Sequence, residues 1–224
     1  MTFIPTLDSD AKQRPRFPRV LNETEVRVLG SLMEKQLSTP EYYPLTLNAL
    51  VAACNQKSNR EPAMELAEED VRHALDRLQD EKFVWKVLGG RAVRFDHNLD
   101  SVWHLNRKEK ALITLLFLRG PQTAGELRGR SDRLHQFASP AEAEELLREM
   151  AAHSEPLVQQ LTRRPGQKEE RWAHTVGGAV AEVAVTSSSP AERAESVSER
   201  VRHLEERVAE LETALNALRG KLGE

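Results

Sequence analysis

Histidine, cysteine and carboxylate side chains are the groups that would carry catalysis or metal binding in this chain, because they transfer protons and ligate metals. The densest set is the run Asp96-His97-Asn98-x-Asp100, and the other histidines are scattered. We interpret this run as a polar loop rather than a metal site. Cys54 is the single cysteine, so the chain cannot form an internal disulfide or a multi-thiolate zinc site. It is more typical of a small buried apolar residue than of a nucleophile.

No phosphate-binding or metalloprotease motif accompanies these residues in the sequence. Gly89 and Gly90 lie between two expected strands, without the following helix that a phosphate-binding loop requires. The sequence therefore predicts no catalytic residue, no metal, no cofactor and no small-molecule ligand. We interpret the chain as a non-enzyme. An enzyme remains as an alternative after an interaction module and a DNA-binding protein, the two hypotheses set out below.

Basic residues are the next candidates for function, and they occur only as local clusters. The chain has 32 Lys+Arg against 35 Asp+Glu, a formal net charge of −3, which argues against a bulk polyanion binder. The clusters fall beside expected strands and in two expected loops. The candidate contacts for nucleic acid or for a protein partner are Lys57, Arg60, Lys86, Arg91, Arg94, Arg128, Arg130, Arg133, Arg163, Arg164 and Lys168.

The elements that position these residues are predicted by a pattern that occurs twice. Asn22 and Asn106 are each followed three residues later by glutamate, the signature of a capping box at the start of a helix. Further along, Pro-x-Thr-x-x-x-Leu occurs at residues 44–50 and again at 121–127, where the threonine is an expected N-cap of a second helix. The sequence therefore predicts two similar halves.

Each half continues with a third helix and two short strands. Apolar spacing predicts third helices over residues 68–80 and 140–153, and strand-forming residues follow at 83–88 with 92–95, and at 157–161 with 171–174. Three helices followed by a hairpin is the order of a winged helix. The predicted fold class is mainly α with small β-hairpins (α+β): two tandem winged-helix domains and a C-terminal coiled-coil helix. A plain helical bundle is the alternative, which the paired strands disfavour.

Composition predicts the domain boundaries. The segments are a mobile N-terminal arm (1–20), winged-helix domain 1 (21–105), winged-helix domain 2 (106–176), a linker (177–196) and a coiled-coil helix (197–224). The sequence contains no run of about 18 apolar residues and no signal-peptide core. We therefore expect a cytoplasmic protein that makes no membrane contact.

The last segment has a heptad pattern. Its flanking charges pair Arg200 with Glu205 and Arg207 with Glu212 in a parallel arrangement, which predicts a parallel homodimer. The alternative is a helix that packs on its own chain. The predicted dimerisation residues are Val197, Val201, Leu204, Val208, Leu211, Leu215, Leu218 and Leu222.

Four strings carry a resemblance to a known family. They are LSTPEYYPLTLN (37–48), ACNQKSNREP (53–62), LRGPQTAGELR (118–128) and RLHQF (133–137). They resemble the YceH-like family of uncharacterised bacterial proteins, and the resemblance covers residues 21 to about 176. It implies two winged-helix domains in tandem, a similar heptad tail and a bacterial cytoplasmic origin. It implies no reaction, ligand or catalytic residue.

The placement of charge separates two functional hypotheses. The expected third helices, which read DNA in many winged helices, are rich in Asp and Glu, and an acidic face is repelled by phosphates. Our first hypothesis is therefore a dimeric interaction module, an adaptor or regulator that binds a protein partner. The alternative is a DNA-binding transcriptional regulator that contacts duplex DNA through its wings and loops.

Overall fold

Capping residues begin the first helix of each half where the sequence predicts them. The computed structural model describes residues 18–88, 92–163 and 169–178. The Asn22 side chain accepts a hydrogen bond from the Glu25 amide at 2.9 Å, and the Glu25 carboxylate accepts one from the Asn22 amide, at the start of α1 (Glu23–Ser38). Asn106 and Glu109 make the same reciprocal pair before α5 (Arg107–Arg119). Both predicted capping boxes are confirmed.

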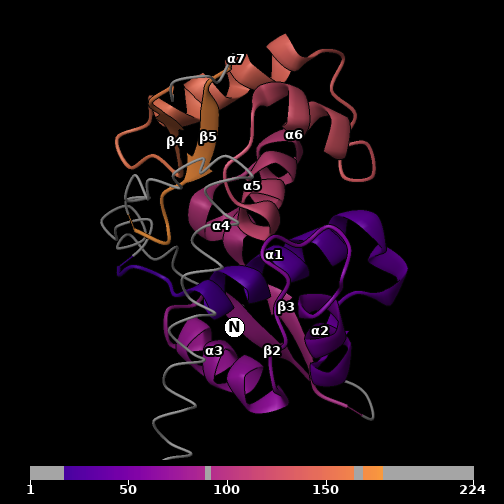
Figure 1. Cartoon of the computed structure of the whole chain (residues 1–224). Coiled ribbons are helices and arrows are strands. Elements are labelled where there is room, and N and C mark those ends of the chain that lie inside the picture. Colours follow the sequence, from indigo (N-terminus) through magenta and orange to yellow (C-terminus); the bar gives the residue numbers. More distant parts are fainter. Residues whose placement is uncertain (1–17, 89–91, 164–168, 179–224) are drawn as a thin grey trace, which may run out of the picture. The chain divides into compact units, whose positions relative to one another are not determined.

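The two halves have the same order of three α-helices followed by a two-stranded hairpin (Figure 1). The first half contains α1, η2 (Pro40–Tyr42), β1 (Leu45–Thr46), α2 (Leu47–Cys54), α3 (Glu68–Asp80), β2 (Val84–Val87) and β3 (Arg94–His97). The second contains α5, α6 (Ala124–Arg130), α7 (Pro140–Ala151), β4 (Val158–Leu161) and β5 (Arg171–His174). Between them lies α4 (Leu99–Trp103), a helix that the sequence analysis missed because five residues are too few to show a helical period.

Both hairpins are antiparallel, and each is extended by the segment that precedes the second helix. In the first half the strand order is β1-β3-β2, with Leu45 opposite Phe95, so β2 is an edge strand. In the second half, Gln122 forms an isolated bridge with Trp172 of β5. Gln122 therefore occupies the place in the second half that Leu45 has in the first. The sequence analysis did not predict either pairing.

One arginine clamp recurs in both halves. Arg94 donates from Nη1 to the Pro44 carbonyl at 2.7 Å, and Arg171 donates from Nη2 to the Pro121 carbonyl at 2.9 Å. The two prolines are the ones in the repeated Pro-x-Thr pattern. Each clamp ties the second hairpin strand of its half to the segment that leads into the second helix.

The halves share one hydrophobic core among the described residues, all of which lie within a compact unit formed by residues 1–180. At Gly30 of α1, an added Cβ would come within 2.9 Å of Phe117 Cβ, so a side chain there would clash with α5. Trp103 lies between Phe83 and Phe117, with ring centroids 5.5 and 6.1 Å away. These contacts join the first half to the second.

The mainly helical α+β class is confirmed by these helices and small antiparallel sheets. Several predictions lie outside the described residues. They concern the arm as far as residue 17, most of the linker, the coiled-coil helix with its dimerisation residues, and the candidate contacts Arg91, Arg164 and Lys168.

Candidate interaction surfaces

The structure removes Arg60 from the candidate surface contacts. Its side chain is fully buried, and its guanidinium donates to both Glu34 oxygens at 3.2 and 2.6 Å. It also donates to the Ala53 carbonyl from Nη2 at 2.8 Å and from Nε at 3.1 Å. Burial is the largest single influence and raises the pKa of Glu34, but the hydrogen bonds and charge of Arg60, together with the Lys35 cation, hold that pKa below its ordinary value. The prediction of an exposed contact at Arg60 was wrong, because the loop folds this side chain inward onto α1.

Three of the predicted bases do converge, on a surface that we call the inter-half groove. This open groove of about 1130 Å³ has Leu115 and Leu118 of α5 among its lining residues. Lys57 comes from the loop after α2, and Arg130 and Arg133 lie at the end of α6 and in the loop after it. Because these loops follow the second helix of each half, the internal repeat brings them to the two sides of one groove.

Positive charge exceeds negative charge around the inter-half groove. Lys35 adds a fourth base, although it pairs with Glu34 at 3.3 Å and Arg130 pairs with Glu126 at 3.6 Å. The acids lining the groove are Glu34, which is also paired with Arg60, and Asp132. Nearby Arg119 donates to Asn59 Oδ1 at 2.8 Å. Burial and then the neighbouring Arg130 cation lower the pKa of Arg119. The groove therefore favours an anionic partner.

The β2–β3 hairpin presents a different kind of surface, which we call the apolar hairpin face. Trp85 is 50% exposed and Leu88 is 78% exposed, and Val87 and Val93 are also exposed. Trp85 pairs with Asp96 and Val87 with Arg94 across the strands, so Trp85 and Val87 point to one side of the sheet and define this face, whereas Val93 lines the groove of Lys86 and Phe95 on the other side. Large apolar side chains clustered on an exposed edge strand are typical of a protein-interaction surface.

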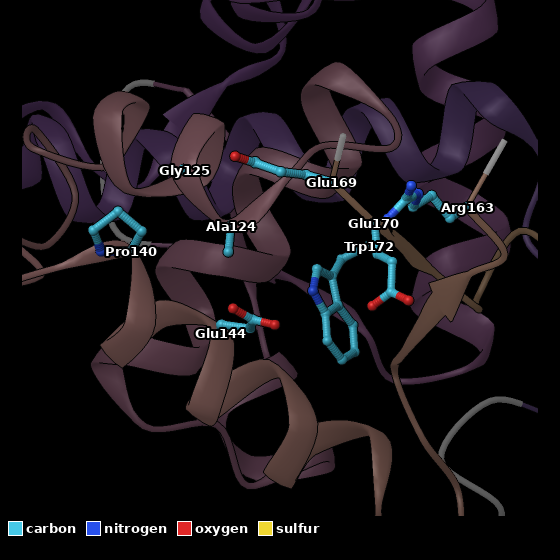
Figure 2. Close-up of a pocket in the computed structure, with 8 residues that line it drawn as sticks. All are labelled: Ala124, Gly125, Pro140, Glu144, Arg163, Glu169, Glu170 and Trp172. Atoms are coloured by element: carbon cyan, nitrogen blue, oxygen red, sulfur yellow. The ribbon is translucent and has the colours of Figure 1, made fainter. Parts of the chain in front are cut away.

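The pockets beside the hairpins of the two halves differ in charge. Figure 2 shows the pocket of the second half, of about 400 Å³, where Glu144, Glu169 and Glu170 lie around Trp172 and Arg163 is the single base among the residues drawn. The corresponding groove of the first half, about 550 Å³, is lined by Arg72 and Lys86 instead. The predicted contact Arg163 therefore sits in an acidic setting that opposes phosphate binding.

The remaining predicted contacts are on the surface or half-buried. Lys86 is exposed, with its Nζ 4.0 Å from Asp76 of α3. Arg128 is half-buried, and the half-buried Arg130 donates to Gln122 Oε1 at 2.7 Å. Exposed acids line α3 as predicted, beginning with Glu68, Glu69 and Asp70.

The Asp96–Asp100 run belongs to β3 and α4 and takes part in a partly buried network rather than forming a polar loop. Gln36 Oε1 accepts hydrogen bonds from His97 Nε2 at 2.9 Å and from Lys110 Nζ at 2.6 Å, and Lys110 pairs with Asp100 at 2.6 Å. Burial lowers the pKa of His97 to about 4, so this imidazole is neutral at pH 7. The network ties β3 and α4 to α1 and α5. Across residues 18–88, 92–163 and 169–178, no group of three or more metal-ligating side chains occurs.

Cys54 is buried at the end of α2, in agreement with its interpretation as a packing residue. Burial raises the pKa of its thiol to about 11. A thiol held in its protonated form at pH 7 is a weak nucleophile.

These observations define a class of protein: a mainly helical α+β chain whose two halves have the same order of elements and share one core. The chain belongs to the family described as "Protein of unknown function, DUF480", which matches residues 21–167. It is 50% identical over 176 residues to a UPF0502 protein of Geobacter metallireducens, covering 78% of this chain and 80% of that protein. It is 49% identical over 175 residues to a UPF0502 protein of Opitutus terrae, with coverage of 77% and 75%. The family resemblance predicted from sequence is confirmed.

None of the helices in the described ranges combines the length with the apolar character that a membrane span requires.

Proposed function

We propose that this protein is a non-enzymatic, cytoplasmic interaction module that acts as an adaptor or regulator of a protein partner. It works as a parallel homodimer held by residues 197–222, and each copy presents one apolar hairpin face. The observation that carries the proposal is the exposure of Trp85 and Val87 on the edge strand β2, next to the exposed Leu88 that follows the strand. Tryptophan supplies a large share of binding energy in protein interfaces, and an edge strand offers unpaired backbone groups to a partner.

The acidic third helices support a protein partner over a phosphate backbone. Arg72 and Arg148 are already paired with Glu68 and Glu144 one turn away, so these bases do not offset the remaining carboxylates. A surface of exposed carboxylates repels DNA, whereas it favours the docking of a partner that carries complementary charge.

Replacing Trp85 with a photoreactive phenylalanine analogue tests the proposal in living cells. We expect a specific cross-linked protein from position 85 and none from position 73, an exposed site on α3 that serves as the control. Trp85→Ala should weaken binding of the identified partner by about 2 kcal/mol, the usual size of a tryptophan hot spot. A cross-link to nucleic acid at position 85, or equal partner binding by Trp85→Ala, would contradict the proposal.

The inter-half groove supports a second candidate function, the binding of duplex DNA through loops. Lys57 and Arg133 extend from loops of the two halves on an exposed surface, and no ion pair joins either base to a described residue. Two bases on opposite sides of one groove can contact the same polyanion together, whereas bases on unconnected surfaces cannot.

Mobility shift with random duplex DNA at 50 and 200 mM salt distinguishes this second candidate. If DNA binds, the double substitution Lys57→Ala and Arg133→Ala should reduce the slope of log K against log salt by about 2, because two phosphate contacts are lost. Arg72→Ala with Arg148→Ala removes the same charge from the acidic helices and should leave the slope unchanged. A wild-type protein that shows no shift at 50 mM salt would rule out this function.

A further inference from the structure

Arg27 of α1 is a buried cation without a carboxylate partner in the part of the chain that the structure describes. It is 2% exposed, and its guanidinium donates to two backbone carbonyls: Nη1 to Cys54 at 3.1 Å and Nη2 to Pro62 at 2.6 Å. Its Nε has no hydrogen-bond partner there. The other buried bases are different, because Arg60 is paired with Glu34 and Lys110 with Asp100.

Within the described ranges, this arrangement leaves a buried positive charge without a direct ion pair, and the charge of Glu23 acts on it only from a distance. Burial and the nearby Arg60 cation lower the pKa of Arg27, but a guanidinium stays protonated in proteins. Buried charges are normally paired, and an unsatisfied buried polar group needs a reason, such as a bound ion or ligand.

A pocket adjoins Arg27, and its walls suit a small amphipathic molecule. The cavity of about 240 Å³ is lined by Arg27 together with apolar side chains from α1, α5 and the loop before α3. His174 of β5 also lines it. Burial lowers the pKa of His174 to about 4, so it adds a neutral imidazole whose Nδ1 has no partner among the described residues. The apolar side chains are Leu21, Val26, Met64 and Phe117.

Two carboxylates lie at the exposed side of the same pocket. Glu23 is one helical turn before Arg27 on α1, and Glu61 precedes the proline that Arg27 binds. They disfavour a ligand with two negative charges and favour one that carries an ammonium group. Their side chains are exposed, so water can still reach them when the pocket is filled.

We propose that this pocket binds a small α-amino acid with an apolar side chain. The ligand carboxylate is held by the Arg27 guanidinium, its ammonium group faces Glu23 and Glu61, and its side chain packs on Val26 and Phe117. The site lies apart from the apolar hairpin face, and the proposal stands independently of the partner protein. A cavity of this size encloses a ligand of few heavy atoms.

Calorimetric titration of the full chain with three matched probes tests the proposal. L-leucine has both charged groups, 4-methylpentanoate lacks the ammonium, and isoamylamine lacks the carboxylate. We expect one leucine per chain, with isoamylamine at least about tenfold weaker because it loses the charge-assisted bonds to Arg27. Absence of heat with leucine would overturn the proposal, and binding of 4-methylpentanoate as tight as that of leucine would overturn the role of Glu23 and Glu61.

Two variants assign the binding to these residues. Arg27→Met should abolish leucine binding, and a folded Arg27→Met that binds leucine like the wild type would overturn the proposal. Because Arg27 also holds the carbonyls of Cys54 at the end of α2 and of Pro62 in the following loop, the double variant Glu23→Gln with Glu61→Gln provides a second test on exposed positions. It should bind leucine about two- to fivefold more weakly, as expected for exposed ion pairs, whereas unchanged binding would overturn their assignment. Glu65→Gln, an exposed change in the same loop, is the control and should have no effect.

Discussion

Replacing Arg60 with alanine is expected to lower the free energy of unfolding by about 3–5 kcal/mol, the usual cost of breaking a buried ion pair. The substitution leaves the Glu34 carboxylate without its bidentate partner and frees the Ala53 carbonyl. Urea denaturation at pH 7 measures the loss. Lys57→Ala in the same loop is the control, and its exposed side chain should change stability by less than about 0.5 kcal/mol. Equal effects of the two substitutions would show that Arg60 is not a structural residue.

The same pair makes a prediction about pH. Arg60 and the neighbouring Lys35 hold the pKa of Glu34 below the ordinary value of 4.5 despite its burial. A carboxyl with a lowered pKa stabilises the folded state fully above its unfolded pKa and loses that contribution as pH falls through the folded pKa. The stability difference between wild type and Arg60→Ala should therefore be largest near neutrality and shrink on acidification, because the buried Glu34 carboxyl is protonated at a higher pH in the variant than in the wild type. A difference that grows on acidification would contradict this account.

Replacing Trp103 with alanine is expected to cost about 3–5 kcal/mol, as large-to-small substitutions of buried aromatic residues do. Trp103 is fully buried, and its indole makes edge-to-face contacts with Phe83 of the first half and Phe117 of the second. Its removal therefore leaves a cavity where the halves meet, and both should unfold in one transition at a lower urea concentration. Separate transitions for the two halves would show that they do not depend on a common core.

Trp85→Ala is the matched control for Trp103→Ala, because the same side chain is removed from a half-exposed position. It should cost less than about 1 kcal/mol in stability. We therefore expect Trp103→Ala to lower the stability of the fold and Trp85→Ala to weaken the binding of a partner.

Local sequence signals predicted much of the fold. The capping boxes at Asn22 and Asn106 act within three residues, so their residue types alone indicate where α1 and α5 begin. The predicted range 68–80 coincides with α3, and 140–153 overlaps α7 (Pro140–Ala151) with an end two residues too late. The repeated Pro-x-Thr pattern marked the second helices, but the strand pairing of β1 and of Gln122 depends on residues about 50 positions away. No local signal carries that information.

The candidate surfaces were less predictable, because exposure and charge pairing depend on the packed structure. The sequence by itself determined the helix starts, the duplicated order of elements and the acidic character of α3 and α7, since these depend on residues within a few positions of one another. Only the tertiary structure decided that Lys57 faces the inter-half groove while Arg60, three residues later, is buried on Glu34. It also decided that Arg27 is buried without a carboxylate among the described residues. The reason is that a side chain's environment is made by segments distant in the sequence, and these meet only when the two halves pack around one core.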